Sequence, residues 1–272
     1  MSALISVIVT TYNWPQALEA CLDSLFAQTD QGFEIIIADD GSASPTHECI
    51  ARCAIRSPVA LRHIHHEDQG FRAAAIRNKA VAASQGAYLI FLDGDCVTLP
   101  HFIARHRVLA EAGYFVPGNR LLLSSHFTQV VLQRAIRLFE QSWPFFIKQR
   151  LFGHLNRLLP LWHIPWQAWR YYKPLRWQNA MTCNLGLWRE DFMAVNGFDE
   201  AFEGWGYEDS DLVIRLIHCG VRRKEGRFAL PVLHLWHTHH DRSRHDENYQ
   251  RLQTRLNDPA IRLAERGIDQ YL

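Results

Sequence analysis

The sequence predicts an α/β fold in which helices flank a mostly parallel sheet. Strand-like apolar segments alternate with segments of helical spacing over residues 4–92. The apolar segments are continuous runs, as expected of parallel strands buried on both faces. Two of these runs end in carboxylates, one at Asp39-Asp40 and one at Asp93-Gly94-Asp95. Because ligands of open α/β sheets bind beyond the carboxyl ends of the strands, these acids mark the expected ligand site.

The first half of the chain contains four predicted strands separated by helices. Residues 4–10 (LISVIVT) are rich in β-branched residues, which favour strands. Pro15 lies in the first turn of the next helix, where its missing N–H costs no hydrogen bond. Leu18, Cys21, Leu22 and Leu25 then keep helical spacing to about residue 28. There follow a strand at 33–38, a short helix from residue 45, a strand at 59–65, a helix at 71–84 and a strand at 87–92. This alternation predicts a parallel sheet.

After residue 178 the chain returns to α/β character. Residues 180–188 and 228–236 are predicted strands. Between them, a helix is predicted from Ser210 to about Cys219, where Gly220 is a stop signal. The tail from residue 246 is polar and predicted to be helical.

Composition and charge exclude several classes of protein. The 272 residues carry a formal net charge of +1, which gives no global attraction for nucleic acid. None of the six cysteines stands in a Cys-x-x-Cys pair, so we expect buried thiols in a reducing compartment. The N-terminus lacks the features of a signal peptide, and no apolar stretch is long enough to span a bilayer. We therefore expect a cytoplasmic protein, with peripheral contact to the inner face of the cell membrane as a further possibility.

The carboxylates at the strand ends point to a metal and a nucleotide. Asp93 and Asp95 could share Mn²⁺ or Mg²⁺ with phosphate oxygens, although a solvated turn is the alternative. Tyr12 and Asp40 should face the same crevice, where an aromatic ring can stack on a base and a carboxylate can accept the N3–H of uracil. Arg77 could bind a phosphate or pair with an Asp of the pocket, and a surface charge is the alternative. The glycine-rich fingerprint of nicotinamide and flavin sites is missing after the first strand.

The segment 126–178 is rich in basic and aromatic residues. Between residues 133 and 177, eight Lys and Arg side chains face a single acid, Glu140. Such composition on helical segments suits contact with an anionic membrane surface. The alternative is a helical insertion that packs on the sheet and lines an acceptor cleft. Binding of single-stranded nucleic acid is disfavoured because no recognised motif accompanies the pattern.

Two further groups in the second half could carry chemistry. Glu208 and Asp209 stand at a predicted helix start, where the helix dipole keeps carboxylates ionised, so either could act as a general base. Trp205 beside them offers a flat face for a sugar ring, although helix capping and a buried Trp are the alternative. His234 and His237 follow the last strand and could ligate a metal together with Asp95. The nearby His239, His240 and His245 are expected to be solvent-exposed.

These residues together resemble a known family, the inverting family 2 glycosyltransferases of the GT-A fold. The second half is similar to the galactosyl- and N-acetylgalactosaminyltransferase domains that include chondroitin-type polymerases and animal β-1,4-galactosyltransferases. The matching pieces, in chain order, are residues 7–13 (VIVTTYN), 37–42 (IADDGS), 77–78 (RN), 91–95 (FLDGD), 196–199 (NGFD), 204–212 (GWGYEDSDL) and His234.

The resemblance implies a role for each candidate residue. Thr10, Tyr12 and Asp40 would hold the uridine, with Arg77 also on the nucleotide-sugar side. Asp93 would contact ribose or metal, and Asp95 would ligate Mn²⁺ or Mg²⁺. His234, with His237 as the second choice, would complete the metal site. Trp205, Gly206 and Glu208 would bind the acceptor. Asp209 would be the catalytic base, with Glu208 orienting the acceptor hydroxyl.

The resulting prediction is a metal-dependent inverting transferase that moves a hexose or N-acetylhexosamine from a UDP-sugar. The acceptor would be a hydroxyl of a surface glycan or lipid-linked glycan, in polysaccharide, capsule or lipopolysaccharide synthesis. The alternatives are a non-catalytic module that binds nucleotide-sugar or glycan, and a nucleotidyltransferase. The expected division is 1–125 for nucleotide-sugar binding, 126–178 for the helical aromatic and basic insertion, 179–245 for acceptor binding and catalysis, and 246–272 for a helical tail.

Overall fold

The computed structural model describes residues 3–238 and 244–272 and has a central seven-stranded sheet in that part of the chain. The strand order is β3-β2-β1-β4-β8-β6-β9. The four predicted strands are β1 (Ile5–Thr11), β2 (Phe33–Asp39), β3 (Leu61–His65) and β4 (Tyr88–Asp93), and their pairings are parallel as expected. β8 (Asn184–Trp188) runs antiparallel to β4 and to β6 (Tyr114–Pro117), and β9 (Arg222–Arg223) is parallel to β6.

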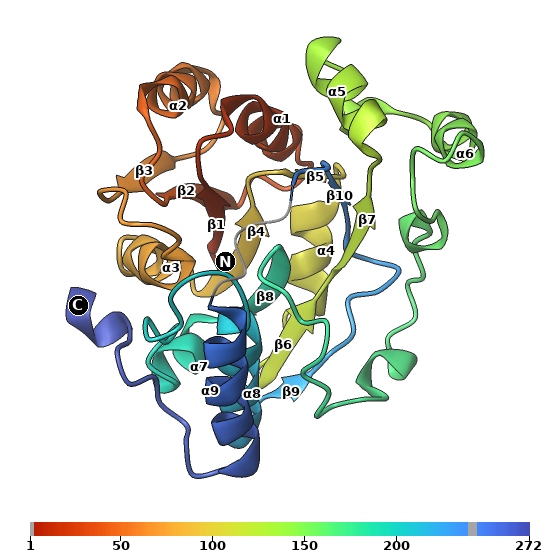
Figure 1. Cartoon of the computed structure of the whole chain (residues 1–272). Helices are drawn as coiled ribbons and strands as arrows, with labels where there is room; N and C mark the ends of the chain where they lie inside the picture. Colours follow the sequence, from red (N-terminus) through yellow and green to blue (C-terminus); the bar gives the residue numbers. More distant parts are fainter. Residues whose placement is uncertain (1–2, 239–243) are drawn as a thin grey trace.

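Helices cover both faces of this sheet (Figure 1). One face packs against α1 (Pro15–Phe26), α2 (Ser44–Arg56) and α4 (Phe102–Leu109). The other face packs against α3 (Ala73–Ala82), α7 (Arg189–Ala194) and α8 (Glu208–His218). α9 (His245–Asn257) lies against α8, and the short η4 (Ile268–Tyr271) contacts α3. Every residue of β2 is buried, and the strand is apolar except for Glu34, which accepts from Ser6 Oγ at 2.7 Å, and the terminal Asp39.

A small second sheet holds part of the candidate site. It consists of β5 (Cys96–Thr98), β10 (Pro231–His234) and β7 (Asn119–Leu122), in the order β5-β10-β7. The sequence analysis did not identify β5, β6, β7 or β9, because strands of two to four residues are too short to show alternation. The predicted strands at 180–188 and 228–236 are likewise shorter in the structure, at 184–188 and 231–234.

The segment after β7 is only partly helical. Its α-helices are α5 (Ser125–Gln133) and α6 (Trp143–Leu151), followed by the 3₁₀ turns η2 (Leu159–Leu161) and η3 (Ala168–Tyr171), with η1 (Leu138–Glu140) between the two helices. Four prolines, at 144, 160, 165 and 174, interrupt the helical spacing that the sequence suggested. In Figure 1 this green segment runs along one side of the molecule. Phe127, Phe139 and Phe146 anchor it to the small sheet.

Within the described residues, no helix is both long enough and apolar enough to cross a membrane.

Candidate active site

The carboxyl ends of β1, β2 and β4 bring the predicted donor-side residues to one edge of the sheet. In the parallel register, Thr10 lies opposite Asp93, and Thr11 lies opposite Asp39. The backbone N–H of Gly94 donates to the carbonyl oxygen of Thr10 at 2.7 Å. A Cβ at Gly94 would lie 3.1 Å from that oxygen, so glycine lets the acidic turn fold back closely onto β1.

Arg77 joins the two halves of the candidate site. From α3, its Nε donates to Thr10 Oγ1 at 3.0 Å, and its Nη2 lies 3.4 Å from Asp93 Oδ1. Its Nη1 donates to Glu208 Oε1 at 3.1 Å, across 131 positions of sequence. Burial alone would lower the pKa of Arg77, but the charges of Asp93 and Glu208 raise it above its usual value. Arg77 therefore pairs with Asp93, an Asp of the pocket as expected, and also with Glu208 from the second half of the chain.

Asp95, His234 and His237 form a group with the donor atoms of a metal site. Asp95 Oδ2 lies 3.5 Å from His234 Nε2 and 3.3 Å from His237 Nε2. All three donor atoms lie within 4.8 Å of one another. The antiparallel pairing of β10 with β5 creates this proximity, because His234 stands opposite Cys96, the residue after Asp95. Asp93 is outside this three-residue group and is paired with Arg77 instead.

The pKa values of Asp95 and His234 are compatible with the binding of a cation by this group. Burial and the neighbouring charge of Asp93 raise the pKa of Asp95 to about 8. Burial and the charge of Arg120 lower the pKa of His234 to about 4, so this imidazole is neutral at pH 7. A neutral imidazole is the form that ligates metal, and a buried carboxylate beside a second acid is stabilised in its charged form by a bound cation. The residues present therefore fit a divalent metal ion.

The predicted base-binding residues are held by partners that the sequence analysis did not identify. The hydroxyl of Tyr12, which is 48% exposed, donates to Asp68 Oδ2 at 2.9 Å, and this hydrogen bond raises the pKa of Tyr12. Asp40 is buried. Its Oδ1 lies 2.6 Å from His66 Nε2, and its Oδ2 accepts from the backbone N–H of Arg72 at 2.9 Å. The strand end at Asp40 is thus rigidly oriented.

The predicted acceptor side is built at the start of α8. Gly206 and Tyr207 have φ angles of 115° and 72°, a left-handed turn that leads directly into Glu208. Glu208 is held by Arg77, whereas burial and the charge of Glu208 raise the pKa of Asp209 to about 7. A carboxyl group with a pKa near neutrality can accept a proton at physiological pH.

An aromatic cluster adjoins these acids. The ring of Trp205 is stacked on His245, with centroids 6.3 Å apart and 14° between the planes. His245 Nε2 lies 3.0 Å from the Tyr207 hydroxyl oxygen. His245 was expected to be solvent-exposed but is partly buried, because α9 begins at this residue and packs against α8. His239 and His240, for which the same expectation was made, lie outside the described residues.

Arg120 is a further basic residue near the metal group. It lies on β7 opposite Val232, two positions before His234 on β10. Its charge partly opposes the rise in the pKa of Asp95 and adds to the fall in the pKa of His234. The ring of Trp14 makes an edge contact with His237 at 6.2 Å between centroids. Arg120 carries no sequence signal, because it reaches the site only through the pairing of two short strands.

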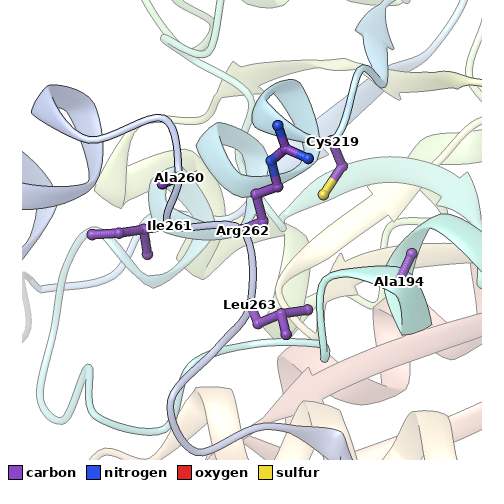
Figure 2. A pocket seen from close by; sticks show the side chains of 6 residues that line it. All are labelled: Ala194, Cys219, Ala260, Ile261, Arg262 and Leu263. Atoms are coloured by element: carbon purple, nitrogen blue, oxygen red, sulfur yellow. The ribbon is translucent and has the colours of Figure 1, made fainter.

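A separate hollow of about 520 Å³ lies away from these residues (Figure 2). It lies between the end of α7, the end of α8 and the segment that follows α9. Its lining consists of Ala194, Cys219, Ala260, Ile261, Arg262 and Leu263. None of the predicted site residues lines it.

Solved structures with the same fold bind nucleotides. A mannosyltransferase from Pyrobaculum calidifontis, in complex with GDP-Man and Mn²⁺, matches with a TM-score of 0.60 at 18% identity, over 97% of this chain and 66% of that one. TarS from S. aureus in complex with UDP matches with a TM-score of 0.61 at 12% identity, over 98% of this chain and 68% of that one. These similarities confirm the expected GT-A fold.

Curated relatives are glycosyltransferases. A validoxylamine A glucosyltransferase from Streptomyces hygroscopicus subsp. jinggangensis is 30% identical over 234 residues, covering 80% of this chain and 52% of the relative. Chondroitin synthase from Escherichia coli is 23% identical over 246 residues, covering 83% of this chain and 34% of the relative. The chain thus spans about half the length, or less, of these relatives.

Two family models together match residues 6–241, which include the predicted site residues. The pattern described as the N-terminal domain of galactosyltransferase matches residues 163–241, in agreement with the expected galactosyltransferase-like second half. Residues 6–163 match Glycosyl transferase family 2. With more than half of its length in that match, the chain belongs to glycosyl transferase family 2.

Proposed function

We propose that this chain is a metal-dependent inverting glycosyltransferase that moves a hexose or N-acetylhexosamine from a UDP-sugar to a hydroxyl group of a glycan or lipid-linked glycan. The observation that carries the proposal is the contact of Arg77 with both Asp93 and Glu208. Through it, the strand end expected to bind the donor lies beside the helix start expected to bind the acceptor. Family membership disfavours the alternative of a non-catalytic binding module.

The metal would be held by Asp95, His234 and His237, whose donor atoms converge. A bound Mn²⁺ or Mg²⁺ would stabilise the charge that develops on the diphosphate leaving group. Support comes from the pKa of Asp95, which burial and the charge of Asp93 raise, and from the Mn²⁺ bound by the mannosyltransferase of the same fold. We assign the donor base and ribose to Thr10, Tyr12, Asp40 and Asp93.

Transfer would be a single displacement. The acceptor oxygen attacks the anomeric carbon while the bond from that carbon to the diphosphate oxygen breaks, and the electron pair leaves with the diphosphate. Asp209 takes the proton of the acceptor hydroxyl, and Glu208, fixed by Arg77, orients that hydroxyl. Asp209 suits the role of base better than Glu208, because Glu208 is engaged by the Arg77 guanidinium. The configuration inverts, and no covalent enzyme intermediate forms.

Trp205 and Gly206 would bind the acceptor sugar. The indole offers an apolar face, and its stacking on His245 fixes the plane of the ring. The left-handed φ of Gly206 sets the direction in which the chain enters α8, and so aligns Trp205 with the two acids.

The segment 143–175 would contact an anionic membrane surface, in line with a lipid-linked acceptor. It carries exposed apolar side chains together with the exposed bases Lys148, Arg150, Arg157 and Lys173. Arg170, which the composition placed among these bases, is buried and donates to three carbonyl oxygens, so it cannot meet lipid. The apolar side chains are Trp143, Ile147, Leu151, Phe152, Leu159, Trp162, Trp166 and Leu175.

A donor screen tests the proposal directly. The chain is incubated with Mn²⁺ and a panel of UDP-hexoses and UDP-N-acetylhexosamines, alongside GDP-mannose, and the released nucleoside diphosphate is measured. Release from at least one UDP-sugar, abolished in Asp95→Ala, is expected. Binding of UDP without turnover of any donor would favour the binding-module alternative, and turnover of GDP-mannose alone would refute the uridine assignment.

A further inference from the structure

A second cluster of side chains that could ligate a metal ion lies at the carboxyl end of β2, outside the site described above. It consists of Asp39 at the end of β2, His47 in α2 and His63 in β3. Asp39 Oδ2 lies 2.9 Å from His63 Nε2 and 3.3 Å from His47 Nε2. The three donor atoms lie within 4.8 Å of one another. None of these residues belongs to the group of Asp95, and they come from different elements.

The fold places these groups on the face of the sheet covered by α2. Side chains alternate along β2, so Asp39 points to the face opposite Asp40. In the parallel register of β2 and β3, His63 stands opposite Ile37, which belongs to the core beneath α1 and α2. His47 approaches from the first part of α2. The cluster therefore has a carboxylate at its base and imidazoles from two neighbouring elements.

One nitrogen of the cluster lacks a hydrogen bond. His47 Nε2 is buried and has no hydrogen-bond partner in the described part of the chain, although it faces the Asp39 carboxylate at 3.3 Å. Asp39 itself is fully buried, and its other oxygen accepts the backbone N–H of Ser42 at 2.9 Å. A buried imidazole nitrogen without a hydrogen bond is costly unless another partner, such as a metal ion, uses its lone pair.

The spacing of the donor atoms suits a tetrahedral ion. Zn²⁺ bonds to imidazole nitrogen and carboxylate oxygen are about 2.0–2.2 Å long, which places tetrahedral ligands roughly 3.3 Å apart. The two distances to Asp39, 3.3 Å and 2.9 Å, are close to this value. Two imidazoles and one carboxylate are donors that suit Zn²⁺. The group at Asp95 has the same protein donors, but there the diphosphate would add the oxygen ligands that suit Mn²⁺ or Mg²⁺.

We propose that Asp39, His47 and His63 bind Zn²⁺ at a site separate from the one at Asp95. The ion would tie α2 and β3 to the turn that follows β2. This turn is already fixed to the loop after β1, because Ser42 Oγ accepts the backbone N–H of Asn13 at 2.9 Å. Occupancy would therefore stabilise the strand end that presents Asp40, without placing the ion beside the transferred sugar.

The test uses the untagged chain, stripped with a chelator and titrated with Co²⁺ as a spectroscopic probe and with Zn²⁺ by calorimetry. Tetrahedral Co²⁺ gives intense visible absorption, which six-coordinate Co²⁺ does not. All variants are made in the His234→Gln background, so that the group at Asp95 does not contribute, and the informative ones are His47→Gln and His63→Gln. The matched controls are His65→Gln, which changes a neighbouring ring 4.7 Å from His47, and the His234→Gln background itself.

His234→Gln alone, and with His65→Gln added, should bind one Co²⁺ with tetrahedral absorption and gain thermal stability with Zn²⁺. In His47→Gln and His63→Gln, Zn²⁺ binding should weaken by more than ~100-fold and the stability gain should vanish. Circular dichroism of the metal-free variants checks that they fold. Three results would overturn the assignment: no Zn²⁺ binding by His234→Gln, tetrahedral absorption retained in both His47→Gln and His63→Gln, or equal loss in His65→Gln.

Discussion

The rate of sugar transfer should fall roughly tenfold for each pH unit below about 7, because Asp209 must be ionised to accept a proton. Burial and the adjacent charge of Glu208 raise the pKa of Asp209 to about 7. About half of the enzyme would thus hold an active base at pH 7, and about 1% at pH 5. The activity is present above this pKa and lost below it, since the working form is the carboxylate.

The assay measures nucleoside diphosphate released at saturating donor, acceptor and Mn²⁺, between about pH 5 and about pH 8.5. Asp209→Asn should lower the rate about 10²–10⁴-fold and remove the acidic limb of the profile. The matched control, Glu208→Gln, removes the neighbouring charge. Its residual activity should show an acidic limb shifted to lower pH, because a carboxylate without an adjacent negative charge ionises more readily.

An independent measurement follows from stability. The pKa of Asp209 is higher in the folded chain than in the unfolded chain, so the folded state binds more protons between about pH 4 and about pH 7. Wild-type stability relative to Asp209→Asn should therefore decrease as the pH rises through this window, as measured by urea unfolding. The reasoning is refuted if Asp209→Asn retains the acidic limb of the rate profile. It is also refuted if the midpoint of that limb moves with Mn²⁺ concentration, which would assign the limb to protonation of the metal ligands.

Three further predictions concern other parts of the molecule. Asp95→Ala should abolish the Mn²⁺ dependence of UDP binding in calorimetry while Asp209→Asn retains it, and an unchanged Mn²⁺ dependence in Asp95→Ala would place the metal elsewhere. Arg77→Met should lower the free energy of unfolding by about 3–5 kcal/mol, because Asp93 and Glu208 lose their buried cation. In the same urea experiment, Arg251→Met, which breaks an exposed pair with Glu247, should cost less than about 1 kcal/mol, and equal effects would contradict the role of Arg77. Flotation with anionic liposomes should weaken when Lys148, Arg150 and Lys173 are changed to Gln, by about 1 kcal/mol per base, and flotation that is insensitive to these changes would exclude the membrane contact.

The sequence sufficed for the parts of the site that follow directly from strand ends. The apolar runs before Asp39 and Asp93 revealed β2 and β4, and their parallel arrangement followed from the helices between them. The metal group was predicted as a set of residue types, but its proximity depends on the pairing of β5 with β10. β10 lies within the strand predicted at 228–236, but β5 has three residues, too few to show a pattern.

Contacts between distant segments were the part that periodicity could not predict. Glu208 and Arg77 are 131 positions apart, and the residue spacing within either helix does not predict that they form an ion pair. The helical content of 126–178 was overestimated. α5 ends at Gln133, shortly before Ala135 with its positive φ, and α6 ends at Leu151, shortly before Gly153 with its positive φ. Pro144 and Pro160 stand in the first turns of α6 and η2. The cluster at Asp39 was not identified either, because its histidines come from two elements whose packing sets the geometry.

The Arg77–Glu208 ion pair has a consequence for engineering this enzyme family. Chimaeras that replace residues 179–245 of this chain with those of another family member would keep Arg77 but exchange Glu208. A recombinant that kept the guanidinium but received an apolar residue in place of Glu208 would leave this buried charge with Asp93 as its remaining carboxylate partner. Transferring Arg77 and Glu208 together keeps the ion pair intact, so crossover points should be chosen such that both residues come from the same parent.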